Sequence, residues 1–148
     1  CLLMAYSHVA HDCVLGDGVI LANGANLGGH VEIGDRATIG GLVGVHQFVR
    51  IGRHAFVGAC SKIAQDIPPF LLADGNPCQP HGLNAIGLKR SGFDRDTIRA
   101  LRRAYRVVFD STIHIGAALD EIESWPEVIP EVTQFVEFIR TTERGIVS

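Results

Sequence analysis

Branched aliphatic residues recur at every sixth position over the first part of the chain. Starting at Leu3 and stepping by six, each position up to Ile63 is Leu, Ile or Val. The series is Leu3, Val9, Leu15, Leu21, Leu27, Ile33, Ile39, Val45, Ile51, Val57 and Ile63. The next residue is usually Gly or Ala, and the fifth place of each hexad is small or β-branched. This pattern is typical of a hexapeptide-repeat β-helix, because the strands of a β-sandwich would alternate with a period of two.

Three hexads make one coil of eighteen residues with three sides. A short strand points one large aliphatic residue inward, and small residues allow the chain to turn at the corner. Asp17-Gly18, Asn23-Gly24 and Gly34-Asp35 provide turn chemistry. Successive coils stack at about the spacing of neighbouring strands, ~4.8 Å. We therefore predict that residues 1–68 form a solenoid in which each coil buries its apolar residues against its neighbours.

The hexads stop at Pro68, and helical patterns follow. Pro68-Pro69 and Gly75-Asn76-Pro77 are breakers, so residues 69–82 are predicted to be a connecting loop. Residues 83–148 are predicted to form a small helical domain, with helices near 83–90, after Asp94, and near 117–124 and 130–142. Asp94 is a good N-cap for the second helix. Its expected buried stripe is Ile98, Leu101, Tyr105, Val108 and Phe109, and that of the last helix is Val132, Phe135, Val136 and Ile139.

Composition narrows the class of protein. Of 148 residues, 47% are hydrophobic and 20% are charged, as in a soluble globular protein, and no apolar run approaches the ~20 residues that cross a bilayer. Four cysteines lack disulfide or metal spacing, so we expect reduced thiols in a cytoplasmic protein. We expect neither nucleic-acid binding nor stable membrane insertion. The repeat is in phase by Leu3 without a preceding cap, so we expect the C-terminal part of a longer protein.

Charge is unevenly distributed, although the net charge is only −3. The stretch from Lys89 to Arg106 is basic, and the tail from Asp110 is mostly acidic. The basic residues of that stretch are Lys89, Arg90, Arg95, Arg99, Arg102, Arg103 and Arg106. Charge alone fits two interpretations equally: a surface for an anionic partner, or a solvated helix face paired with the acidic tail.

The eighteen-residue coil predicts a cluster of histidines. His11, Gly29 and Gln47 are spaced by eighteen and should stack at one corner, with His30 and His46 beside them. Three histidines would suit zinc with an open position for water, as in the trimeric hexapeptide carbonic anhydrases. A neutral imidazole would equally suit general-base catalysis. The unhindered N–H of Gly29 modestly favours acyl transfer, since it would stabilise an oxyanion.

Several motifs resemble one known family. The segment from Leu2 to Cys13 closely resembles the catalytic coil of the UDP-N-acetylglucosamine O-acyltransferases, the first enzymes of lipid A synthesis. The likeness continues through Gly29-His30-Val31, Val45-His46-Gln47-Phe48, Gln65-Asp66-Ile67-Pro68-Pro69, Gly75-Asn76-Pro77, Asn84 and Gly87-Leu88-Lys89-Arg90-Ser91-Gly92-Phe93. The last motif lies beyond the solenoid and distinguishes this family from other hexapeptide transferases.

The resemblance implies a left-handed parallel β-helix followed by a C-terminal α-helical domain, assembled as a homotrimer with active sites between subunits. The reaction would move an (R)-3-hydroxyacyl group from acyl carrier protein to the 3-hydroxyl of UDP-N-acetylglucosamine. It would need no metal, and no cofactor beyond the phosphopantetheine of the carrier. The acidic carrier protein would bind at the basic stretch from Lys89 to Arg106.

The resemblance also implies residue roles. His11 would be the general base, Asp12 would orient it, and the N–H of Gly29 would bind the oxyanion. The sugar nucleotide would be surrounded by His8, His30, His46 and Gln47. Asn84 and Arg90 would contact the nucleotide or the phosphopantetheine arm, and Ala59 would limit acyl length.

One departure and two alternatives complete these expectations. Ser91 stands where many family members have a second arginine, which would weaken phosphate binding. The related N-acyltransferase acting on the glucosamine amine is the second hypothesis, and the motif from Gly87 to Phe93 argues against it. A zinc-dependent or purely structural β-helix is the third.

Overall fold

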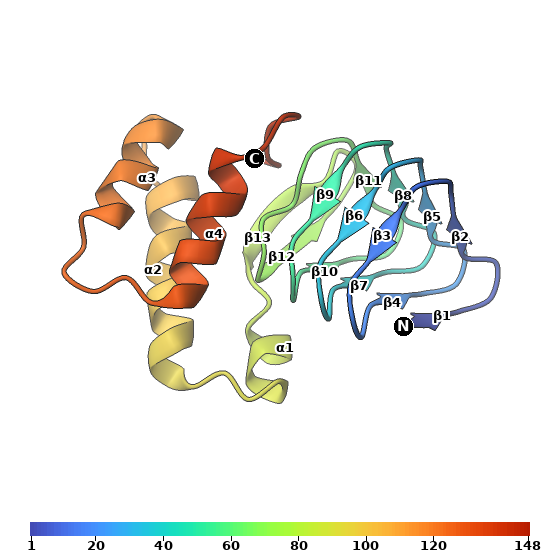
Figure 1. Cartoon of the computed structure of the whole chain (residues 1–148), viewed down its shortest axis with the longest axis horizontal. Helices are drawn as coiled ribbons and strands as arrows, with labels where there is room; N and C mark the ends of the chain where they lie inside the picture. Colours follow the sequence, from blue (N-terminus) through green and yellow to red (C-terminus); the bar gives the residue numbers. More distant parts are fainter.

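A three-sided parallel β-helix followed by four α-helices makes up the fold (Figure 1). The computed structural model describes all residues, 1–148. The strands of the β-helix are β1 (Leu2–Leu3), β2 (His8–Val9), β3 (Val14–Leu15), β4 (Ile20–Leu21), β5 (Asn26–Leu27), β6 (Glu32–Ile33), β7 (Thr38–Ile39), β8 (Gly44–Val45), β9 (Arg50–Ile51), β10 (Phe56–Val57) and β11 (Lys62–Ile63). The parallel β-helix predicted from the period of six is confirmed.

Three sheets form the sides of the coil, and their register gives the predicted repeat. Sheet A has the order β1-β4-β7-β10-β12-β13, sheet B the order β11-β8-β5-β2, and sheet C the order β3-β6-β9. Parallel partners among β1 to β11 are eighteen residues apart, as in Leu3↔Leu21, Leu21↔Ile39 and Leu27↔Val45. The aliphatic hexad residues from Leu21 to Ile63 are buried in one continuous core.

The corners of the coil have an unusual backbone conformation. Every sixth residue from Tyr6 to Cys60 has a positive φ, between 55° and 71°. The series is Tyr6, Asp12, Gly18, Gly24, His30, Arg36, Leu42, Phe48, His54 and Cys60. Only two are glycine, and each of the others costs roughly 1–2 kcal/mol of backbone strain. Hydrogen bonds between stacked corners offset this cost, for example from His30 N to the His11 carbonyl at 3.0 Å. The corner side chains therefore form ladders along the solenoid, with eighteen residues between rungs.

The solenoid continues beyond Pro68, so the predicted connecting loop over 69–82 is wrong. β12 (Leu71–Asp74) pairs in parallel with β10, and β13 (Gln79–Leu83) pairs antiparallel with β12. The prolines end the hexad pattern, but the free edge of β10 still offers backbone groups to a following strand. Pro80 fits in β13 because this strand is the outermost of sheet A.

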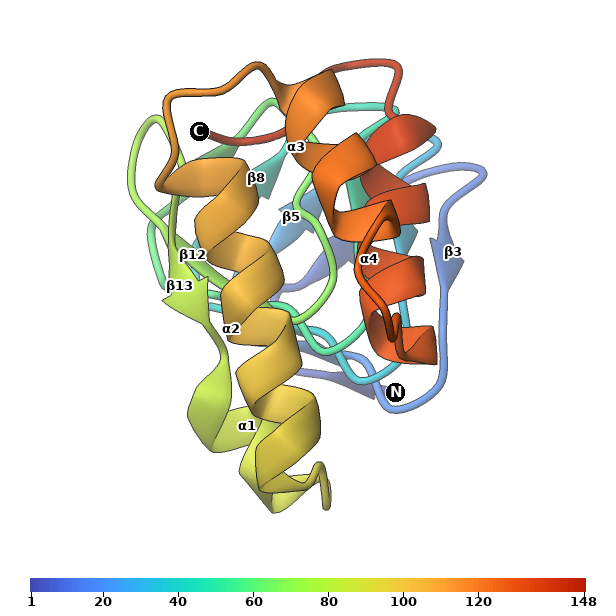
Figure 2. The same cartoon turned by 90° about the vertical axis from the view of Figure 1, so that its left-hand side faces the viewer.

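Four helices cover the C-terminal end of the solenoid (Figure 2). They are α1 (Ala85–Arg90), α2 (Arg95–Phe109), α3 (Ile115–Glu123) and α4 (Pro130–Arg140). The predicted N-cap is confirmed, because Asp94 Oδ1 accepts a hydrogen bond from Thr97 N at 2.7 Å. In α2 the predicted residues Ile98, Leu101 and Tyr105 are buried, whereas Val108 and Phe109 are half-buried. The predicted stripe of α4 is buried throughout.

A buried carboxylate joins the solenoid to the C-terminal tail. Asp66 is 1% exposed, and its Oδ1 accepts from Arg50 N at 2.8 Å. Its Oδ2 accepts from the Thr142 hydroxyl at 2.6 Å and lies 3.5 Å from Arg50 Nε. Arg50 also donates to the Phe138 carbonyl at 3.0 Å. This network fixes α4 and the tail against the last coil.

No helix of the chain combines the length and the apolar character that a membrane span requires.

Two glycines offer a test of how tightly the coils stack. A Cβ at Gly34 would lie 2.5 Å from Arg53 N in the next coil, whereas a Cβ at Gly44 would meet nothing within 4 Å. Gly34→Ala should lower the free energy of unfolding by about 2 kcal/mol, because the coils must separate. Gly44→Ala, the matched control, should change it by about 0.5 kcal/mol or less. Urea denaturation measures both, and equal effects would show that the coils are not in contact at Gly34.

Candidate active site

His11, Asp12 and His30 meet at the corner that joins sheet B to sheet C. His11 Nδ1 lies 3.0 Å from Asp12 Oδ2, and His30 Nε2 lies 3.6 Å from the same oxygen. The two imidazole rings contact edge to face, with their centroids 5.1 Å apart. All three side chains are exposed to solvent. The corner therefore presents two imidazoles around one carboxylate.

The predicted stacking of His11, Gly29 and Gln47 is confirmed. A Cβ built on Gly29 would lie 2.6 Å from His11 Cε1, so the imidazole lies directly over the glycine. A Cβ on Gly28 would lie 2.8 Å from Gln47 N in the following coil. The N–H of Gly29 donates to no protein acceptor, as at most equivalent corner positions. Among these corner positions, Gly29 is the only one that has a free N–H, no side chain and an imidazole lying over it.

The carboxylate of Asp12 determines which nitrogen of His11 carries the proton. The hydrogen bond from His11, followed by the positive charge of His30, lowers the pKa of Asp12 below its ordinary value. Asp12 is therefore ionised at neutral pH and accepts the Nδ1–H of His11. This tautomer leaves Nε2 of His11 as the basic nitrogen that faces outward.

His8 and His46 lie near this corner but outside the group. His8 is in β2, opposite Asn26 of β5. Nδ1 of His46 lies 3.1 Å from the carbonyl oxygen of Gln47. The donor atoms that lie within 4.8 Å of one another, and could hold a metal ion, belong to His11, Asp12 and His30. Within one copy of the chain, His46 therefore does not join His11 and His30 as a third histidine ligand.

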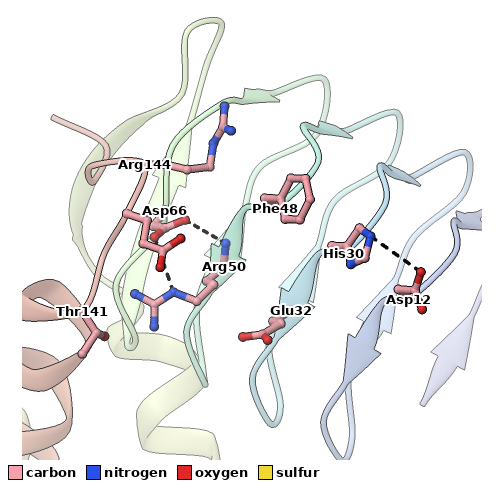
Figure 3. A pocket seen from close by; sticks show the side chains of 9 residues that line it. Asp12, His30, Glu32, Phe48, Arg50, Asp66, Thr141 and Arg144 are labelled. Carbon is pink, nitrogen blue, oxygen red and sulfur yellow. Dashed lines mark hydrogen bonds and ion pairs between the residues drawn. The ribbon is translucent and has the colours of Figure 1, made fainter.

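Phe48 and two arginines extend the corner into a groove (Figure 3). Phe48 stacks on His30, with the ring centroids 4.6 Å apart and an interplanar angle of 7°. The groove has a volume of about 410 Å³ and runs from Asp12 and His30 to Arg50 and Arg144. Phe48 was missed as a site residue, although the spacing of eighteen in Asp12, His30 and Phe48 could have indicated it.

Asn84 and Arg90 lie in a different cavity, between the outer face of sheet A and α1. This cavity has a volume of about 610 Å³ and includes neither His11 nor His30. The Asn84 side chain already has protein partners: Oδ1 accepts from Gly87 N at 3.2 Å, and Nδ2 donates to the His54 carbonyl at 3.0 Å. Within one copy of the chain, these two residues are not brought to the histidine corner.

Ala59 lies at the third corner, which joins sheet A to sheet B. It is exposed and lines neither cavity. Its backbone stacks under Gly40, where an added Cβ would lie 2.7 Å from Ala59 N. Its predicted role in limiting acyl length stays a prediction.

The β-helix and its repeats define the class of protein. A family model described as bacterial transferase hexapeptide (six repeats) matches residues 1–29 and 30–65. A second model, described as UDP N-acetylglucosamine O-acyltransferase, domain 2, matches residues 66–147. The chain belongs to the UDP-N-acetylglucosamine O-acyltransferase family, which confirms the resemblance found in its motifs.

Individual relatives agree with this assignment. The chain is 49% identical over 98% of its length to an acyl-[acyl-carrier-protein]–UDP-N-acetylglucosamine O-acyltransferase of Burkholderia orbicola, and 46% identical over 98% to that of Thiobacillus denitrificans. It spans 57% and 56% of those two proteins, respectively. The structure of LpxA from Acinetobacter baumannii superposes with a TM-score of 0.94 at 41% identity, covering 99% of this chain and 57% of that one. The Moraxella catarrhalis enzyme gives a TM-score of 0.94 at 43% identity, covering 98% of this chain and 56% of that one.

Titration can test the electrostatics of the corner. Replacing His11 by Ala should raise the pKa of Asp12 toward its ordinary value, because the hydrogen bond that stabilises the carboxylate is lost. His30→Ala should raise it less, because His30 acts only through its charge. Carboxyl-carbon NMR of Asp12 against pH measures both shifts. A larger shift in His30→Ala would mean that the charge of His30, and not the hydrogen bond, dominates.

Proposed function

We propose that the protein transfers an (R)-3-hydroxyacyl chain from acyl carrier protein to the 3-hydroxyl of UDP-N-acetylglucosamine, the first step of lipid A biosynthesis. One observation carries the proposal: an imidazole oriented by a carboxylate lies directly over a glycine whose N–H has no protein acceptor. A general base and an oxyanion donor must lie side by side for acyl transfer. The names of the relatives give the same donor and acceptor.

The geometry supports a direct transfer. Nε2 of His11 removes the proton of the sugar 3-hydroxyl as its oxygen attacks the thioester carbonyl carbon. The carbonyl oxygen becomes an oxyanion, which accepts a hydrogen bond from Gly29 N–H. The tetrahedral intermediate then expels the thiolate, which takes the proton from the imidazolium. Asp12 stabilises the imidazolium while the proton is on His11. The chemistry uses no cofactor other than the pantetheine arm that carries the acyl group.

We assign the other predicted histidines and Gln47 to binding of the sugar nucleotide. His30, held flat against Phe48, together with His8, His46 and Gln47, would contact the sugar nucleotide. The two halves of the site lie at different corners, because Asn84 and Arg90 line the other cavity. We therefore include a homotrimer in the proposal, in which the histidine corner of one copy faces the α1 cavity of the next. The chain spans about 57% of the length of its relatives, so the full-length protein is the unit to which this function applies.

Helix α2 offers a surface to the acidic carrier protein. Four of its exposed arginines form no ion pairs with the chain's own carboxylates and lie on one side of the helix. They are Arg95, Arg99, Arg102 and Arg106. Arg103 is instead stacked over Trp125, with 4.0 Å from the guanidinium carbon to the ring centroid.

The four cysteines are free thiols, consistent with a reaction in the cytoplasm.

Replacing the proposed base tests the mechanism. His11→Ala should lower kcat by about 10²–10⁴-fold, because the hydroxyl loses its proton acceptor. His81→Ala is the matched control, since His81 is exposed on β13 and lies outside both cavities. The assay follows acyl transfer to UDP-N-acetylglucosamine and, in parallel, to the corresponding glucosamine amine. Undiminished turnover in His11→Ala, with the fold intact by circular dichroism, would refute the role of His11, and preference for the amine would favour N-acyl transfer.

Charge reversal on α2 tests the carrier surface. Arg99→Glu should raise the KM for the acyl-carrier substrate about 5- to 10-fold at low salt, with little change in kcat or in the KM for the sugar nucleotide. The effect should shrink at high ionic strength, because salt screens exposed charges. Lys62→Glu makes the same charge change on β11 and serves as the control. Equal effects of the two substitutions would mean that net charge, and not this surface, attracts the carrier.

A further inference from the structure

The cavity between sheet A and α1 carries only positive formal charge. Its charged residues are Arg36 and Arg90, and no aspartate or glutamate lines it. The apolar part of its wall comes from sheet A and the first turn of α1. The lining residues used below are Gly18, Arg36, His54, Phe56, Arg90 and Ser91. A concave site with an apolar wall and unbalanced positive charge suits a ligand that carries an anionic group.

Both guanidinium groups are available to a ligand. Neither Arg36 nor Arg90 forms an ion pair or a side-chain hydrogen bond within the chain. Asp35, the neighbour of Arg36, instead accepts a hydrogen bond from Asp17 N at 2.8 Å. In the other groove, by contrast, Arg50 is already paired with the buried Asp66. The two cavities therefore differ in what their arginines can still bind.

The fold holds Arg36 in position over this cavity. Arg36 occupies the corner that joins sheet C to sheet A, with φ of 59°, and its N–H donates to the Asp17 carbonyl at 2.8 Å. Its side chain lies across Gly18, where an added Cβ would come within 3.4 Å of Cγ and 3.8 Å of Nε. The Arg36 side chain therefore packs on the backbone of the preceding coil.

The histidine that lines this cavity, His54, adds no positive charge to it. His54, the next rung after Arg36 of the same ladder, is only 5% exposed and packs against Phe93 with ring centroids 5.0 Å apart. Burial lowers the pKa of His54, and the charges of Arg53 and then Arg36 lower it further. His54 therefore stays neutral at neutral pH, and the cations of the cavity remain Arg36 and Arg90.

We infer that Arg36 binds a substrate phosphate together with Arg90 in this cavity. The inference rests on the proposed function only for the source of that phosphate, either the diphosphate of the sugar nucleotide or the phosphodiester of the carrier's pantetheine arm. Ser91 lines the same cavity and has no charge. Arg36, which comes from the solenoid and not from α1, supplies a second cation beside Arg90.

Binding of paired ligands by the full-length protein tests the inference. Isothermal titration compares uridine diphosphate with uridine, and 4′-phosphopantetheine with pantetheine. Arg36→Ala should weaken binding of at least one phosphorylated ligand about tenfold, the size of a lost charge-assisted hydrogen bond. Binding of uridine and pantetheine should be unchanged. Arg36→Lys should recover part of the loss, and Lys62→Ala, which removes one charge elsewhere, should have no effect.

The pattern of losses identifies the source. A loss confined to uridine diphosphate supports the nucleotide, and a loss confined to 4′-phosphopantetheine supports the carrier arm. Unchanged affinity of Arg36→Ala for both phosphorylated ligands would overturn the inference. So would equal losses for the ligands without phosphate, or no binding of either phosphorylated ligand to the unmodified protein.

Turnover separates this inference from the proposed function. Arg36→Ala should raise the KM of the substrate whose phosphate it binds, with kcat within about twofold, because the residue is remote from the reacting atoms. If the unmodified protein transfers no acyl group to either acceptor, the proposed function fails. The titrations with isolated ligands still decide the role of Arg36 in that case.

Discussion

Close stacking of the coils is the constraint on which the rest of the structure depends. Each coil lies at strand spacing from the next, so wherever backbones approach most closely there is no room for a side chain. At Gly34 and Gly52 an added Cβ would come within 2.5 Å and 2.3 Å of backbone nitrogens in the following coil. The same spacing fixes the register at eighteen residues, and the register places His11 over Gly29. The arrangement of the His11 imidazole over the N–H of Gly29 is therefore a consequence of how the solenoid packs.

The corner conformation explains why polar residues can form such a site. A left-handed backbone at each corner costs free energy for a residue with a Cβ, and that cost persists only where stacked coils leave no alternative. Asp12, His30 and Phe48 all occupy such corner positions in one ladder, and Arg36 and His54 occupy another. Because hydrogen bonds between coils hold the backbone at these corners, the side chains start from defined positions. A catalytic group mounted in this way needs little further ordering when substrate binds.

Much of this could be predicted from the sequence, because a period of six leaves few architectures open. The series from Leu3 to Ile63 gave the β-helix, and the spacing of eighteen gave the stacking of His11, Gly29 and Gln47. The strands β12 and β13 were missed because the prolines around them indicate a loop. Their pairing is also set by the free edge of β10 and not by the repeat. Phe48 and Arg36 were missed because an aromatic or basic residue at a corner has no distinctive local pattern. Its significance appears only when the neighbouring coils and α1 are in place.

One full side of the solenoid separates the histidine corner from the cavity next to α1. The histidine corner and the Arg36 corner are separated by sheet C, so one hexad of chain connects them. Six residues span at most about 20 Å. A ligand bound to both His11 and Arg90 of one copy would have to reach across that face. In the proposed homotrimer, a second copy that places its own α1 cavity against the histidine corner would bring the imidazole of His11, the N–H of Gly29 and the arginines of that cavity around one substrate.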